Sequence, residues 1–108
     1  MESVPDMPKQ GLSLLDVREP DEWAAGHAPE AVHIPLGELP GRLDELAGFP
    51  DDQPLYVVCR TGGRSAQATA WLNANGWDAV NVAGGMKSWQ TEGRTLVGDG
   101  AGAEPQVL

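Results

Sequence analysis

The chain has 108 residues, 41% hydrophobic and 21% charged, as expected for one globular domain. Seven basic and sixteen acidic side chains give a formal net charge of -9, which argues against a nucleic-acid partner because phosphate binding needs a basic surface. The chain has no apolar run of membrane-spanning length, and its polar first residues do not form a secretory signal. We therefore expect a cytoplasmic domain without a membrane partner.

Short apolar runs alternate with helix-like segments along the chain. In chain order, the pattern predicts a strand at 12–17, a helix within 19–27 that ends at Gly26, a strand at 31–34, a helix at 38–47, a strand at 55–58, a helix at 65–75, a strand at 79–82 and a helix at 85–92. This alternation predicts an α/β fold: a mostly parallel central sheet of about four to five short strands with helices on both faces.

The ends of the chain carry weaker signals. We assign residues 1–97 to a single domain and 98–108, which are rich in Gly, Ala, Pro and acid, to a flexible C-terminal tail. Residues 3–5 could add a short edge strand. His27 and His33 have no metal-ligand spacing to each other or to the single cysteine, so we expect no metal site.

The segment 59–65 (CRTGGRS) contains the only cysteine and joins the strongest predicted strand to a helix. Ligands of open α/β sheets bind at this carboxyl end of the strands. No Asp or Glu occurs from 53 to 77, although the protein is acidic, and Arg60 and Arg64 both fall in that window. The segment is therefore a candidate site for a small anion.

The residue types in this loop suit a reactive thiol. Gly62 and Gly63 allow left-handed backbone angles that turn N–H groups inward, and the following helix adds its own free N–H groups. Such donors, together with the two arginines, would stabilise a thiolate at Cys59 and make it a nucleophile. The alternative is a buried Cys59 that acts only as a small hydrophobic residue at a strand end.

Three blocks of the chain resemble the rhodanese (sulfurtransferase) homology domain, over about residues 12–94. They are LLDVREPDEWAAGHAPEAVHIP at 14–35, VVCRTGGRSAQATAWLNANGW at 57–77 and VNVAGGMKSW at 80–89. The resemblance implies that Cys59 is the persulfide-forming nucleophile. It also implies that the rest of the loop binds the substrate, namely Arg60, Thr61, Gly62, Gly63, Arg64 and Ser65.

The same resemblance implies the reaction partners. The expected donor is thiosulfate or a similar small anion, and the expected acceptor is cyanide, a thiol or a sulfur-accepting protein, with no cofactor. The sequence departs from the family in two places. Only about eleven residues precede the predicted strand at 12–17, so the strand that the family usually places before it must be abbreviated. Glu30 stands where the family usually has a turn glycine.

Residues outside the loop are assigned supporting roles. Asp16, Arg18 and Glu22 are predicted to form an Arg–carboxylate network that holds the loops at the strand ends. His27 is expected to be a hydrogen-bonding loop residue, with a catalytic base as the alternative. The four tryptophans are expected to pack in the core.

Two other functions use the same scaffold. Cysteine phosphatases place five residues between Cys and Arg, whereas four separate Cys59 from Arg64, so the smaller ring suits one sulfur atom better than a phosphate. Arsenate reduction occurs within the family on similar short loops. A sulfur-relay module that serves a partner protein also remains open.

Overall fold

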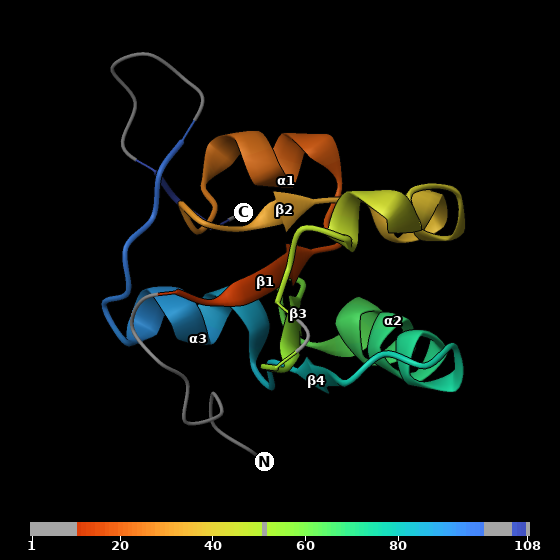
Figure 1. Cartoon of the computed structure of the whole chain (residues 1–108). Coiled ribbons are helices and arrows are strands. Elements are labelled where there is room, and N and C mark those ends of the chain that lie inside the picture. The colour runs from red at the N-terminus through yellow and green to blue at the C-terminus, as the bar shows by residue number, and fades with distance from the viewer. Residues whose placement is uncertain (1–10, 51, 99–104, 108) are drawn as a thin grey trace.

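The computed structural model describes residues 11–50, 52–98 and 105–107. Its centre is a four-stranded parallel sheet in the order β2-β1-β3-β4 (Figure 1). The strands are β1 (Ser13–Asp16), β2 (Val32–His33), β3 (Leu55–Val58) and β4 (Ala79–Asn81), and the α-helices are α1 (Pro20–Ala25), α2 (Gly63–Ala74) and α3 (Gly85–Thr91). The predicted α/β fold is confirmed. The edge strand predicted at 3–5 lies outside the described residues.

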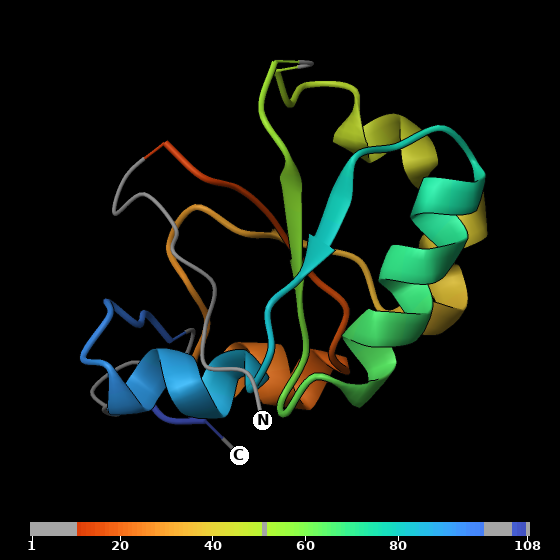
Figure 2. The same cartoon turned by 90° about the horizontal axis from the view of Figure 1, so that it is seen from below.

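The strands divide the core into two layers, because successive side chains of a strand point to opposite faces of the sheet. One cluster joins the sheet to α2 and includes Leu15, Val57, Ala68 and Leu72. The other joins the sheet to α3 and includes Leu14, Val58, Met86 and Trp89. Accordingly, α2 and α3 lie on opposite sides of the sheet in both views (Figures 1 and 2).

The helix predicted at 38–47 is wrong. The structure has two short 3-10 segments instead, η1 (Leu36–Gly41) and η2 (Leu43–Leu46). Pro40 lies inside η1, where it has no N–H to donate and its ring crowds the preceding turn, so an α-helix cannot continue through it. Part of the predicted apolar face is buried in the structure. Leu39 and Leu46 are buried, while Ala47 is exposed.

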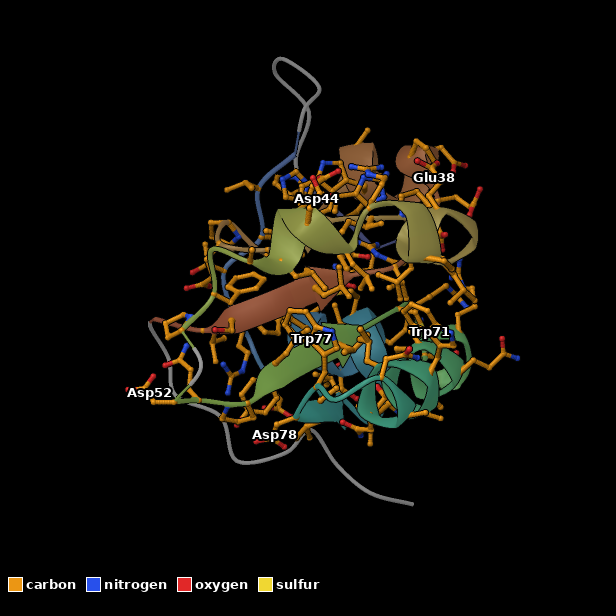
Figure 3. All side chains as sticks on the ribbon, turned by 45° about the vertical axis from the view of Figure 1, so that its right-hand side comes forward. Glu38, Asp44, Asp52, Trp71, Trp77 and Asp78 are labelled. Carbon is orange, nitrogen blue, oxygen red and sulfur yellow. The ribbon has the colours of Figure 1, made fainter. Side chains whose placement is uncertain are left out.

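Three of the four tryptophans pack in the two core layers, as predicted, whereas Trp23 belongs to neither cluster and stacks on His27 instead. Trp71 of α2 and Trp77, just before β4, are partly buried against the cluster that also holds the 3-10 segments (Figure 3). Trp89 of α3 is 2% exposed in the opposite layer. Exposed acids lie on the outside of the same view: Glu38, Asp44, Asp52 and Asp78.

The C-terminal residues contact the domain at the end of α1. Val97 forms an antiparallel bridge with His27, with both N–H···O distances 2.8 Å. Gln106 donates its N–H to the carbonyl of Ala25 at 2.9 Å. Residues 105–107 are therefore attached to the domain, and the flexibility predicted for 98–108 stays a prediction for the rest of that segment. Within the described ranges, no helix is long and apolar enough to cross a membrane.

Candidate active site

Cys59 follows β3 directly and is 1% exposed. Its Sγ accepts a hydrogen bond from the Gly62 N–H at 3.1 Å and lies 3.3 Å from the Ser65 hydroxyl. Gly62 is the N-cap of α2, and Ser65 lies in the first turn of that helix. The structure thus brings together the end of β3, the loop and the start of α2 around one sulfur atom.

Two opposing effects act on the Cys59 thiol. Burial raises its pKa, but hydrogen bonds from the Ser65 hydroxyl and from the N–H groups of the loop lower it more, so the pKa lies below its ordinary value. A lower pKa increases the fraction of thiolate at neutral pH, and the thiolate is the nucleophilic form. The loop can therefore make Cys59 reactive.

The two loop glycines have different roles. Gly62 has φ +116°, a left-handed conformation that side chains rarely adopt, whereas Gly63 is the first residue of α2 and a Cβ there would meet no atom within 4 Å. Only Gly62 therefore shows the left-handed angle that the sequence predicts for the turn.

The start of α3 packs against the backbone of the cysteine. The N–H of Met86 donates to the Cys59 carbonyl at 2.8 Å, and the N–H of Lys87 donates to the Arg60 carbonyl at 3.0 Å. At Gly85, a Cβ would lie against these two carbonyl groups, and φ is +56°. The glycine thus permits a close approach that holds the loop in place.

Arg64 forms a bidentate ion pair with Glu22 of α1. Its Nη1 and Nη2 donate to Oε1 and Oε2 at 2.7 and 2.9 Å, and the Glu22 side chain is 14% exposed. The hydrogen bonds from Arg64 lower the pKa of Glu22 to about 2 although burial raises it, and the Glu19 N–H helps to lower it. Glu22 is therefore ionised at neutral pH and ties α1 to the start of α2.

This pair predicts a specific loss of stability in acid. Because the pKa of Glu22 is lowered from 4.5 to about 2 on folding, its contribution is complete above pH 4.5 and is lost as the pH falls towards 2. After allowance for solvent screening, we expect a contribution of about 1–2 kcal/mol. Glu22→Gln should remove this pH dependence from the free energy of unfolding measured in urea.

The exposed acid Glu30 provides the matched control for that measurement. Glu30→Gln should leave the acid dependence as it is in the wild type. A Glu22→Gln profile that parallels the wild type between pH 4.5 and 2 would contradict the assigned ion pair.

The predicted Arg–carboxylate network is divided into two pairs. Arg18 binds Asp16, with Nη2 2.8 Å from Oδ2, and both side chains are 0% exposed. The same Nη2 donates to the Gly26 carbonyl at 2.7 Å, while Nη1 has no hydrogen-bond partner in the described part of the chain. Asp16 and Arg18 thus connect the end of β1 to the end of α1, and Glu22 belongs to the Arg64 pair instead.

His27 contacts α1 and the C-terminal segment. Its ring stacks on Trp23 with centroids 3.6 Å apart, and Nδ1 donates to the Trp23 carbonyl at 2.7 Å. His33 stacks on Trp23 at 4.7 Å, and its Nε2 donates to the Arg18 carbonyl at 2.8 Å. These contacts favour a structural role for His27.

Asn81 of β4 contacts the loop, although it is not among the residues predicted for the site. Its Nδ2 donates to the Gly62 carbonyl at 3.3 Å, and its Oδ1 accepts from the Ser65 hydroxyl at 2.5 Å. One signal was present: a polar side chain at the carboxyl end of an otherwise apolar strand, where sites of parallel sheets form.

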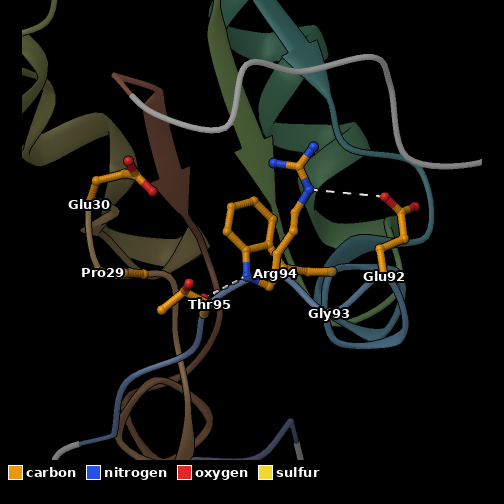
Figure 4. A pocket seen from close by; sticks show the side chains of 7 residues that line it. Pro29, Glu30, Glu92, Gly93, Arg94 and Thr95 are labelled. Atoms are coloured by element: carbon orange, nitrogen blue, oxygen red, sulfur yellow. Dashed lines mark hydrogen bonds and ion pairs between the residues drawn. The ribbon is translucent and has the colours of Figure 1, made fainter.

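A cavity of about 450 Å³ lies elsewhere in the described part of the chain (Figure 4). It is near the C-terminal end of α3, where Arg94 stacks over the Trp89 ring at 5.1 Å and the indole N–H donates to the Thr95 carbonyl. None of the residues predicted for the site lines it.

Comparisons with known proteins agree on one family. The model of the rhodanese-like domain matches residues 2–92. The chain is 41% identical over 81 residues to the putative sulfurtransferase YtwF of Bacillus subtilis, covering 75% of this chain and 76% of that protein. It is 36% identical over 84 residues to the thiosulfate sulfurtransferase GlpE of Pseudomonas syringae, covering 77% and 76%. A crystal structure of a rhodanese-like domain protein from Staphylococcus aureus has a TM-score of 0.65 at 41% identity, covering 84% and 83%.

Proposed function

Because the chain belongs to the rhodanese-like domain family, we propose that it is a cytoplasmic sulfurtransferase that carries one sulfane sulfur as a persulfide on Cys59. The observation that carries this proposal is the set of donors around the cysteine, with Gly62 N–H at 3.1 Å and the Ser65 hydroxyl at 3.3 Å from Sγ. Donors that converge on one atom suit a single anionic sulfur.

In the first step, the Cys59 thiolate attacks the outer sulfur of thiosulfate or a similar donor. A bond forms between Sγ and that sulfur, the S–S bond of the donor breaks, and its electron pair leaves with sulfite. The N–H groups of the loop then stabilise the negative charge of the persulfide. Arg60 and Arg64 are proposed to attract the donor, Arg64 with the N–H groups that Glu22 does not use.

In the second step, a nucleophilic acceptor attacks the outer sulfur of the persulfide. Cyanide or a thiolate forms the new bond to sulfur, and the electron pair of the broken S–S bond returns to Cys59 as a thiolate. A thiol on a sulfur-accepting protein would react in the same way. Every atom and electron pair is accounted for by donor, cysteine and acceptor.

Intact-mass spectrometry tests the first step. After incubation with thiosulfate and removal of the excess, the wild-type protein should gain the mass of one sulfur atom, and cyanide should remove it. Cys59→Ser should show no gain, since Cys59 is the only cysteine in the chain. An unmodified wild-type mass after thiosulfate would refute thiosulfate as the donor, and the same result with a persulfide donor would refute the sulfurtransferase proposal.

A further inference from the structure

The amide of Asn81 contacts two of the residues that donate towards the Cys59 sulfur, Gly62 and Ser65. Oδ1 is 2.5 Å from the Ser65 hydroxyl, and Nδ2 is 3.3 Å from the Gly62 carbonyl. Asn81 is the last residue of β4, which pairs with β3, the strand that ends just before the cysteine. Asn81 can therefore act on the sulfur through these two donor residues.

The orientation of this amide follows from its partners. The Gly62 carbonyl can only accept a hydrogen bond, so it requires the Nδ2 donor. This leaves Oδ1, which can only accept, against the Ser65 hydroxyl. Two oxygen atoms 2.5 Å apart need a proton between them, and Ser65 supplies it.

The Ser65 hydroxyl has one proton and two acceptors within reach. Asn81 Oδ1 is at 2.5 Å and Cys59 Sγ at 3.3 Å, and the serine is 0% exposed, so water cannot freely replace either partner. While the proton points to Asn81, Ser65 presents a lone pair to the sulfur, which suits a protonated thiol. An anionic sulfur needs the proton turned towards it.

We propose that Asn81 is a positioning residue that competes with the Cys59 sulfur for the single Ser65 proton, and so limits how strongly the loop stabilises an anion at that sulfur. Formation of a thiolate or persulfide rotates the Ser65 hydroxyl towards the sulfur, and the Ser65 and Asn81 oxygens then move apart from their 2.5 Å contact. The O–H bond does not break, and the proton of the thiol goes to solvent. The role in sulfur transfer rests on the proposed function, whereas the effect on the thiol does not.

Charged residues also stand on the elements packed around the cysteine. They are Arg60 in the loop, Arg64 on α2 with its partner Glu22 on α1, Lys87 on α3 beside the Arg60 carbonyl, and Asp16 at the end of β1, which is paired with Arg18. All of them are unchanged when Asn81 is replaced. A difference between variants at that position therefore reports on the amide and its two hydrogen bonds.

The pKa of the Cys59 thiol is measured from the rate of alkylation by iodoacetamide as a function of pH. The protein for this measurement has not been incubated with a sulfur donor. Asn81→Ala should lower this pKa by about one unit, because the full Ser65 hydrogen bond becomes available to the thiolate. Asn81→Leu, which keeps more of the side-chain volume, should give a change of the same sign. In a Ser65→Ala background, Asn81→Ala should leave the pKa unchanged.

A remote asparagine serves as the control. Asn73 on α2 hydrogen bonds the backbone of Ala79 through Nδ2 at 3.0 Å and Oδ1 at 2.7 Å, and Asn73→Ala should not change the thiol pKa. An unchanged or raised pKa in Asn81→Ala and Asn81→Leu, or an equal shift with and without Ser65, would overturn the proposal and leave Asn81 as a tether for the Gly62 carbonyl. A shift as expected without any sulfur gain by mass would contradict only the proposed function.

Discussion

Arg18→Met is expected to lower the free energy of unfolding by about 3–5 kcal/mol, because it leaves the Asp16 carboxylate buried without its cation. Both side chains are 0% exposed, and Arg18 also holds the Gly26 carbonyl at the end of α1. A loss of this size is a large part of the stability of a small domain, about 5–15 kcal/mol. Urea unfolding followed by circular dichroism measures it.

Arg42 forms ion pairs that are exposed to solvent, so Arg42→Met serves as the comparison for Arg18→Met. Arg42 binds Glu38 and Glu45 at 2.8 and 2.6 Å, but the side chains are 34%, 57% and 41% exposed. Arg42→Met should therefore have a much smaller effect than Arg18→Met. Combining Asp16→Leu with Arg18→Met should restore part of the stability, since no unpaired charge remains. Equal losses in the free energy of unfolding for Arg18→Met and Arg42→Met would contradict the conclusion that burial makes the Asp16–Arg18 pair more important.

Gly85→Ala should both destabilise the protein and slow sulfur loading. A Cβ at this position would lie 2.7 Å from the Arg60 carbonyl oxygen and even closer to that of Cys59. The left-handed backbone adds about 1–2 kcal/mol and the overpacking about 1–3 kcal/mol. The start of α3 must then move away from the loop and lose its hydrogen bonds to Cys59 and Arg60. Urea unfolding and the rate of mass gain from thiosulfate measure the two effects.

Gly48 is the matched glycine for this comparison. A Cβ there would meet no atom within 4 Å, and the residue is not among those with positive φ. Gly48→Ala should therefore change the free energy of unfolding and the loading rate little. If Gly85→Ala loads sulfur at the wild-type rate, the close approach of α3 does not control the loop.

Local sequence patterns predicted most of the fold. The strand at 55–58 and the following glycine-containing loop were placed correctly because an apolar run and a turn are encoded by neighbouring residues. The segment at 38–47 was misread as one helix because its leucine spacing fits a helical face, whereas Pro40 and the backbone at Arg42 divide it. Residues 53–77 contain no acid in the sequence. In the structure, however, Glu22 of α1 forms an ion pair with Arg64, so an acid does lie beside this segment.

The sequence by itself determined the α/β alternation and the nature of the loop: one cysteine, two glycines and two arginines before a helix. Only the tertiary structure decided the partners of those residues. Glu22 and Arg64 are 42 positions apart, and Ser65 and Asn81 are 16 apart. Parallel strands bring their carboxyl ends to the same edge of the sheet, so residues that follow or end different strands meet there. Which acid pairs with which arginine, and which asparagine contacts the serine, depends on that packing rather than on sequence spacing.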